Sequence, residues 1–234
     1  MTYTIRQINE RAISIIYPES ISGEVHQKVM DTARLFQGEF PGLLTDVVPS
    51  YHQVTLFFKR QIFYEEACQW IDKVMEQTQE DLVEVTKRTI TLPVLYGGEW
   101  GPDLEKVASV TGLSKEDVIE RHTAGFYTVY MLGFLPGFPY LGGLDGSLNT
   151  PRRDTPRQIV PAGSVGIAGA QTGVYPLASP GGWQLIGRTP RILVDIHHPD
   201  PCLFRPGDQL RFVAITEADY RDMEKEAKCN ANHD

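Results

Sequence analysis

Long apolar runs and paired cysteines are missing from this sequence of 234 residues. The apolar runs reach only a few residues, as at 54–58, whereas a membrane-spanning helix needs about 20. The three cysteines, Cys68, Cys202 and Cys229, are far apart and form no CxxC pair. They predict neither a disulfide framework nor a structural zinc site, and they fit a reducing compartment. Because residues 1–6 also lack the pattern of a signal peptide, we expect a cytoplasmic protein without a membrane span.

An excess of positive charge is also missing. Lys and Arg number 22 against 30 Asp and Glu, which gives a net charge of −8. An acidic chain is a poor partner for nucleic acids and for anionic membranes. The GxxxxGK(S/T) phosphate loop is absent, so the sequence shows no recognisable cradle for ATP. The six histidines show no ligand spacing, and we therefore expect no metal site.

Lysine and glutamate disappear from one part of the chain. Residues 121–216 contain neither, yet they hold 14 of the 21 Gly and 11 of the 16 Pro. Because strong helix formers are absent where turn formers are dense, this part should consist of strands and loops. We predict two folding units, residues 1–87 and 88–216, followed by a charged tail at 217–234 that we expect to be a frayed helix.

The first unit has alternating strand and helix patterns. Short β-branched or alternating runs predict strands at 12–17, 44–49 and 53–59, and helical spacing predicts helices at 22–38 and 64–80. This order is typical of a small sheet with helices on one face, an α+β domain with a ferredoxin-like layout. Another strand at 88–94 either completes this sheet or begins the second unit.

A short helical insert lies at about 102–123. Gly112 is a natural stop between two helices, and Ser114 with Asp117 matches a capping box at the start of the second. The spacing also matches a DNA-binding helix-turn-helix, whose second helix enters the major groove. Because the second helix shows three acids and two bases, which DNA phosphates would repel, we favour two packed helices joined by a glycine turn.

One serine lies in a sequence that imitates a nucleophile elbow. Residues 162–166 read AGSVG, with Ser164 at the centre. An elbow needs a helix directly after the serine, so that the hydroxyl lies over the helix N-terminus. The residues that follow are rich in Gly and Ala and do not predict a helix. We therefore interpret Ser164 as a turn or strand residue.

Aromatic residues, glycines, prolines and arginines are dense between residues 131 and 190. Glycine lets the backbone approach a ligand closely, and proline stiffens that approach. Aromatic rings supply apolar walls, while Arg and Gln supply directed donors for a carboxylate or an amide. The tight corners of a β-barrel would by themselves explain most of the glycines and prolines. The sequence therefore leaves two interpretations: a barrel with a pocket for a small polar acid or amide, and a barrel without such a pocket.

The same region contains long motifs in a fixed order: YGGE (96–99), GPDL (101–104), YMLGF (130–134), PGFPYLGGL (136–144), TPR (150–152), VPAGSVGI (160–167), QTGVYP (171–176) and SPGGWQLIGRTP (179–190). These motifs resemble the family of 5-oxoprolinase B subunits, also called allophanate hydrolase subunit 1, which includes the kinase A inhibitor KipI. The resemblance covers about residues 90–215, and the N-terminal unit fits the family by pattern. It implies an α+β N-terminal domain and an all-β, cyclophilin-like barrel.

The resemblance also implies an activity that is shared among subunits. It implies pairing with a homologous C subunit of 5-oxoprolinase and with a separate A subunit, for the ATP-dependent hydrolysis of 5-oxo-L-proline to L-glutamate. Amide resonance makes the lactam carbonyl a poor electrophile, and phosphorylation of its oxygen would create a better leaving group. ATP would then bind a partner subunit, which agrees with the missing phosphate loop. The chain would be active only with its partners.

Residue type and motif density predict which side chains contact the substrate. Guanidinium and carboxamide groups would stabilise developing charge, and aromatic rings would form the wall. No catalytic residue is assigned. The expected substrate-binding residues are Arg152, Gln171, Gln184, Arg188, Tyr175, Trp183 and Phe138.

The kinase inhibitor branch of the family implies a second function. In that case the barrel would dock on a sensor histidine kinase and block its autophosphorylation without turnover. A cyclophilin-like groove also suggests a third function, the binding of proline loops or prolyl isomerisation. The motifs are common to the enzyme and inhibitor branches, so the sequence does not separate these two functions. Two measurements do: glutamate formation with the A and C subunits, and loss of kinase autophosphorylation.

Overall fold

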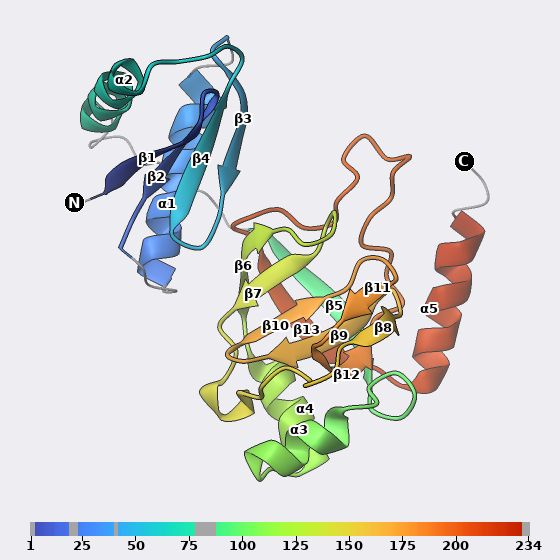
Figure 1. Ribbon diagram of the computed structural model, residues 1–234. Helices are drawn as coiled ribbons and strands as arrows, with labels where there is room; N and C mark the ends of the chain where they lie inside the picture. The colour runs from blue at the N-terminus through green and yellow to red at the C-terminus, as the bar shows by residue number, and fades with distance from the viewer. Residues whose placement is uncertain (1–2, 19–22, 40–41, 78–87, 231–234) are drawn as a thin grey trace. The chain divides into compact units, whose positions relative to one another are not determined.

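The computed structural model describes residues 3–18, 23–39, 42–77 and 88–230. Its contacts divide the chain into two compact units, Met1–Thr86 and Lys87–Asp234, which Figure 1 colours from blue at the N-terminus to red at the C-terminus. Each unit has a hydrophobic core of its own. No helix in the four described ranges is long and apolar enough to cross a bilayer.

The first unit is a four-stranded antiparallel sheet packed against two helices. The strand order is β1-β2-β4-β3. Alternation along the strands turns Ile13, Ile15, Val54 and Leu56 to one face, where they form a single core with buried side chains of both helices. Both helices therefore cover the same face. The elements are β1 (Thr4–Asn9), β2 (Ala12–Ile16), α1 (Gly23–Glu39), β3 (Leu44–Pro49), β4 (Gln53–Phe58) and α2 (Tyr64–Gln77).

The mixed α and β character predicted for this unit is present, but the ferredoxin-like layout is not confirmed. Strand β4 lies between β2 and β3, the two strands that α1 connects, as in a split βαβ unit, but the fourth strand of the sheet precedes this unit in the chain instead of following α2. The edge strand beside β2 is β1, which the sequence patterns did not predict. Its residues are almost all exposed, so they carry no alternating apolar signal. The strand expected at 88–94 lies in the second unit as β5 (Thr89–Tyr96).

The second unit is built around a closed barrel of seven strands in the order β10-β7-β6-β13-β5-β12-β9 (Figure 1). Strands β13 and β5 are parallel, and the other neighbouring pairs are antiparallel. The all-β barrel predicted for this region is therefore confirmed. Besides β5, the barrel strands are β6 (Tyr127–Leu132), β7 (Pro139–Gly142), β9 (Ser164–Ala168), β10 (Gln171–Val174), β12 (Gln184–Arg188) and β13 (Gln209–Ala214).

A two-stranded sheet and the position of Ser164 complete the description of the strands. Strands β8 (Arg157–Val160) and β11 (Ser179–Gly181) pair with each other in a separate two-stranded sheet. Ser164 begins strand β9, is buried, and is followed by strand residues. Its interpretation as a turn or strand residue is therefore confirmed.

The insert folds as two packed helices joined by a glycine turn, as predicted. They are α3 (Leu104–Thr111) and α4 (Lys115–Ala124), and Gly112 ends α3 with a φ of 70°, a conformation that favours glycine. The capping box is formed: the backbone N–H of Asp117 donates to Ser114 Oγ at 3.0 Å, and the Asp117 carboxylate accepts from the Ser114 N–H at 3.2 Å. Val107 and Val118 join the barrel core.

The charged tail is ordered by tertiary contacts. It forms helix α5 (Glu217–Asn230), where a frayed helix was expected. Tyr220 is buried, which raises the pKa of its hydroxyl, and the nearby charge of Arg188 opposes that rise. Its ring lies 5.9 Å from that of Trp100, measured between centroids. These contacts anchor the first turns of α5 on the barrel unit.

Candidate functional site

A pocket of about 260 Å³ lies in the barrel unit and combines five aromatic rings with one arginine. Three of its lining residues, Phe138, Tyr175 and Trp183, belong to a hydrophobic cluster that is separate from the barrel core. Four of the side chains predicted from the sequence, Phe138, Arg152, Tyr175 and Trp183, line it together. The complete lining is Phe134, Phe138, Tyr140, Arg152, Pro156, Tyr175, Pro180, Gly181, Gly182 and Trp183.

Phe138 is the centre of the aromatic wall. Its ring centroid lies 5.0 Å from Tyr140, 5.1 Å from Tyr175 and 5.4 Å from Trp183. The contacts are edge-to-face, the arrangement that ring quadrupoles favour. Phe138 itself is only 1% exposed, so its orientation is fixed by packing. The wall is therefore a rigid apolar surface.

Two glycines allow the rings to pack this closely. A Cβ atom at Gly173 would lie 3.0 Å from ring atoms of both Phe138 and Trp183. A Cβ atom at Gly181 would lie 2.5 Å from the Tyr175 hydroxyl oxygen and 2.9 Å from two carbons of its ring. Such distances are below van der Waals contact, so neither position accepts a side chain without movement of the wall.

The polar atoms of the pocket gather around Arg152. Burial raises the pKa of the Tyr175 hydroxyl, while a hydrogen bond with the Trp183 backbone, the charge of Arg152 and, as a smaller effect, the charge of Arg157 oppose that rise. Burial likewise raises the pKa of Tyr140, and the charge of Arg152 again opposes it. Both tyrosines therefore keep their protons at neutral pH and can donate them in hydrogen bonds. Since no carboxylate of the described residues forms an ion pair with Arg152, its guanidinium can bind an anion.

Phe134 at the edge of the pocket has a strained backbone. Its φ is 66°, and no other non-glycine residue in the described ranges has a positive φ. For a bulky residue this conformation costs roughly 1–3 kcal/mol. The ring lies 5.6 Å from that of Phe138, yet it remains 60% exposed. Because strain of this kind is concentrated at functional sites, Phe134 supports the assignment of a site here.

A buried carboxylate lies next to the pocket. Asp103 Oδ1 accepts hydrogen bonds from Arg153 at 3.0 Å and from Arg157 at 2.7 Å. Its Oδ2 accepts from the backbone N–H of Leu185 at 2.7 Å. Asp103 flanks the N-terminus of α3, but its side chain makes no capping bond to that helix. Two of the three clustered arginines therefore have a structural partner, and Arg152 does not share it.

Gln184 contacts the chain on which Arg152 lies. Its Nε2 donates to the carbonyl oxygen of Pro151 at 2.9 Å, and its Oε1 is buried without a hydrogen-bond partner. The side chain does not line the pocket. Gln184 therefore supports the backbone of Pro151, the residue that precedes Arg152 in the chain.

The other two predicted residues lie elsewhere on the barrel. Gln171 begins β10 and is paired with Ala168 across the β9–β10 hairpin. Arg188 ends β12, pairs with Ser164, and lies close enough to Tyr220 of α5 for its charge to affect the pKa of the Tyr220 hydroxyl. Neither lines the aromatic pocket. Their roles stay predictions, and the pocket does not depend on them.

Sequence reasoning missed six of the lining residues. Tyr140, Pro180, Gly181 and Gly182 lie within the same motifs as the predicted residues Phe138 and Trp183, so motif membership was a signal for them. Pro156 lies just after the arginine cluster. Phe134 ends the motif at 130–134, which contains none of the predicted residues.

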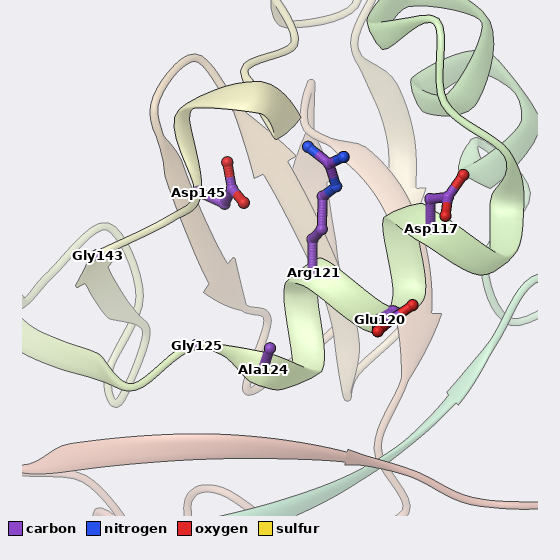
Figure 2. A pocket seen from close by; sticks show the side chains of 7 residues that line it. All are labelled: Asp117, Glu120, Arg121, Ala124, Gly125, Gly143 and Asp145. Carbon is purple, nitrogen blue, oxygen red and sulfur yellow. The ribbon is translucent and has the colours of Figure 1, made fainter.

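Figure 2 shows a second pocket, of about 540 Å³, beside α4. The Arg121 side chain extends between Asp145 and Asp117 and donates to Ser147 Oγ at 2.7 Å. The two carboxylates accept hydrogen bonds within their own turns. In the described part of the chain, no group of His, Cys, Asp and Glu is arranged to hold a metal. Arg121, Asp117 and Asp145 thus have hydrogen-bond partners nearby, and their placement needs no ligand to explain it.

A third hollow, of about 700 Å³, lies between α5 and strands β5 and β13. Pro93, Val213 and Met223 make it largely apolar, and Arg191 lies at its side. It contains no cluster of aromatic rings around a charged group. The aromatic pocket is therefore the candidate functional site.

Solved structures with the same fold include proteins of several lengths. TTHA0988 is 38% identical with a TM-score of 0.74, and the match covers 88% of this chain and 40% of that chain. The conserved uncharacterized protein PH0987 from Pyrococcus horikoshii is 41% identical with a TM-score of 0.56, over 93% of this chain and 100% of that chain. The Kluyveromyces lactis urea carboxylase, at 21% identity and a TM-score of 0.77, covers 96% of this chain and 23% of that chain and shows a shared fold alone.

Relatives of similar length share a single name. The 5-oxoprolinase B subunit of Bacillus subtilis is 43% identical over 96% of this chain and 98% of its own length. That of Haemophilus influenzae is 41% identical over 88% of this chain and 95% of its own length. The family described as "Carboxyltransferase domain, subdomain C and D" matches residues 3–204, which include every residue of the aromatic pocket. The chain therefore belongs to the family of 5-oxoprolinase B subunits.

Proposed function

We propose that the chain is the B subunit of a cytoplasmic, ATP-dependent 5-oxoprolinase, which hydrolyses 5-oxo-L-proline to L-glutamate. In this proposal it acts with a homologous C subunit of the enzyme and with a separate A subunit. The relatives named as B subunits of 5-oxoprolinase support it, because such a name implies further subunits. The aromatic pocket would bind the substrate.

The observation that carries this proposal is the position of Arg152 at an aromatic pocket. 5-Oxoproline has a carboxylate, a flat lactam and an apolar edge. A guanidinium forms paired, charge-assisted hydrogen bonds with a carboxylate, and the rings around Phe138 offer an apolar surface to the lactam ring. A cavity of about 260 Å³ is just below the usual range for ligand pockets, which suits a single-ring substrate.

The tyrosines give the pocket donors for the remaining polar atoms. The Tyr175 and Tyr140 hydroxyls lie close enough to Arg152 for its charge to affect their pKa values. Both remain protonated, so each can donate to an oxygen of the substrate. In this arrangement Arg152 binds the carboxylate and the hydroxyls orient the lactam carbonyl. Binding in one orientation is itself a contribution to catalysis.

The pocket does not fit ATP. A triphosphate carries several negative charges, whereas the lining contains one cationic side chain, Arg152, and no lysine. Its volume is also small for a nucleotide. We therefore place the ATP site on a partner subunit, and we assign no step of the phosphate chemistry to this chain.

The proposal is tested by reconstitution. The purified chain is mixed with the A and C subunits of the same source, ATP and 5-oxo-L-proline, and L-glutamate is measured. Glutamate is expected in the complete mixture and in none of the mixtures that omit one component. Absence of glutamate with authentic partners that assemble with the chain would overturn the proposal.

Inhibition of a sensor histidine kinase is the second candidate function. Exposed apolar side chains favour it: Phe134 is 60% exposed, and Ile159 of strand β8 is 70% exposed, as expected at a surface that another protein covers. Binding to such a kinase with loss of its autophosphorylation, and no glutamate in the complete mixture, would support this candidate instead.

A further inference from the structure

We propose that Asp103 is a positioning residue that leaves Arg152 as the single guanidinium facing the aromatic pocket. This selects a ligand with one carboxylate. The inference rests on the proposed function for the identity of the ligand. Its structural part concerns residues 151–157, here called the arginine arm, which contain Arg152, Arg153 and Arg157.

Two of the three arginines on the arm are engaged by one carboxylate. Arg153 and Arg157 both bond to Asp103 Oδ1, and the Asp103 side chain is only 6% exposed. A buried carboxylate with two guanidinium partners is strongly held, because removal of the carboxylate would leave both guanidinium groups without a counter-charge. Arg152 is the arginine that lines the pocket. Asp103 thus keeps two competing cations away from it.

The same carboxylate connects the arm to the pocket wall. Asp103 Oδ2 accepts from the Leu185 N–H, and the Asp103 N–H donates to the Leu185 carbonyl at 2.8 Å. Leu185 follows Gln184, whose side chain bonds to Pro151 on the arm. Strand β12 and the arm are therefore joined at two points, one through Asp103 and one through Gln184.

The backbone on both sides of Arg152 is fixed by these and neighbouring contacts. On one side the Pro151 carbonyl accepts from Gln184 Nε2. On the other side the Arg153 N–H donates to the Gly182 carbonyl at 2.8 Å, and Gly182 lines the pocket. With both flanking peptide groups held, the direction of the Arg152 side chain depends on the arm as a whole.

The position of Asp103 in sequence argues for a dedicated role. It occupies the residue that flanks α3, where Asp ordinarily accepts a bond from the first turn of its own helix. Here neither oxygen does so, and both are directed to residues 50 or more positions further along the chain. Loss of the charge would release the arm and leave three arginines free to meet an anion.

The first test measures the arm without any ligand. Trypsin cleaves after arginine, so cleavage after Arg152 and Arg157 in the native chain, mapped by mass spectrometry, reports local opening of the arm. We expect cleavage of the Asp103→Asn variant to be faster by about tenfold or more, as for a segment that opens without global unfolding. The exposed Asp154 lies on the same arm, and Asp154→Asn is the matched control, with cleavage at the wild-type rate.

Two further variants keep this test decisive. Asp103→Glu retains the charge and should restore most of the slow cleavage. Arg153→Gln removes one of the two ion pairs and serves if Asp103→Asn does not fold, with faster cleavage after Arg157 expected. Equal cleavage rates in wild type, Asp103→Asn and Arg153→Gln would overturn the proposal.

The second test uses the assembled enzyme. Asp103→Asn should raise KM for 5-oxoproline by about tenfold and change kcat by less than about twofold, because a disordered Arg152 weakens binding in ground and transition states alike. Inhibition by a dicarboxylate such as glutarate should become stronger relative to that of wild type. An open arm with an unchanged KM would contradict the positioning role. If the wild-type complex forms no glutamate, the proposed function fails, and the protease test still decides the role of Asp103 in the arm.

Discussion

His122 Nε2 lies 3.0 Å from the hydroxyl oxygen of Thr172, in the interior of the barrel unit. On the other side of the ring, Nδ1 lies 2.8 Å from the Tyr96 hydroxyl. Because Thr172 Oγ1 donates to the Gly166 carbonyl, it accepts from Nε2–H, and Tyr96 then donates to Nδ1. One neutral tautomer satisfies every bond in this chain. Burial lowers the pKa of His122 to about 3.

This burial predicts a loss of stability in mild acid. An unfolded histidine has a pKa of about 6.5, so the unfolded state binds a proton below that pH while the folded His122 does not until about pH 3. The free energy of unfolding should therefore fall as pH decreases through this interval. Between pH 7.5 and pH 4.5 the loss due to His122 is about 3 kcal/mol. Urea unfolding followed by circular dichroism at both pH values measures it.

A matched pair of variants isolates the contribution of His122. His122→Gln removes the titrating group and should flatten the decline by most of that amount, even if the variant is less stable at pH 7.5. His197→Gln, at an exposed position, should decline as wild type does. A decline of equal size in His122→Gln and wild type would show that His122 is not responsible.

Arg152 is expected to determine the affinity for the substrate carboxylate. Hydrogen bonds to a charged group contribute about 1.5–3 kcal/mol, so Arg152→Ala should weaken 5-oxoproline binding by roughly 10- to 100-fold. Arg152→Lys keeps the charge but not the paired hydrogen-bond geometry, so its affinity for 5-oxoproline should lie between those of wild type and Arg152→Ala. Isothermal titration calorimetry and KM in the assembled enzyme provide the measurements. The control is Arg191→Ala in the third hollow, and a loss of equal size there would contradict the assignment.

Gly181 is expected to be indispensable for the shape of the pocket. The Cβ of Gly181→Ala would collide with the ring and hydroxyl of buried Tyr175, and overpacking of this kind costs roughly 1–3 kcal/mol. We expect a lower Tm together with a loss of 5-oxoproline affinity. Gly146→Ala is the control, since a Cβ there meets no atom within 4 Å. Unchanged affinity and Tm in Gly181→Ala would mean that Tyr175 can move freely.

The isolated chain should not bind ATP. The aromatic pocket has one cationic side chain for a ligand with several charges, and residues 121–216 contain no lysine. Calorimetry with Mg-ATP should therefore give no heat of binding for the chain alone and a clear signal once the A subunit is added. Binding to the chain alone in the micromolar range would require an ATP site within this chain.

Those parts of the fold that depend on local signals were predictable from the sequence. The capping box of Ser114 and Asp117 and the stop at Gly112 involve residues a few positions apart, and each is present. The barrel follows from a composition that disfavours helices. Strand β1 is exposed at every residue except the half-buried Ile5, and helix α5 is held where Tyr220 lies beside Arg188 and Trp100. Neither feature leaves a periodic signal in sequence.

The candidate site was predictable only to the extent that motif neighbours are also spatial neighbours. Phe138 and Trp183 meet at 5.4 Å, as their motifs suggested. Gln171 and Arg188 lie in equally dense motifs, but strand register places them opposite Ala168 and Ser164, outside the pocket lining. The role of Asp103 depends on contacts 50 residues away. Register and long-range pairing have no signature in a single sequence.

The three tryptophans of the chain lie in separate surroundings. Trp70 packs against Phe36 in the first unit, and Trp100 packs against Tyr220. Trp183 lines the aromatic pocket. In a chain whose other two indoles are replaced by phenylalanine, all tryptophan fluorescence would originate at the pocket wall, so its occupancy could be followed optically without an attached dye.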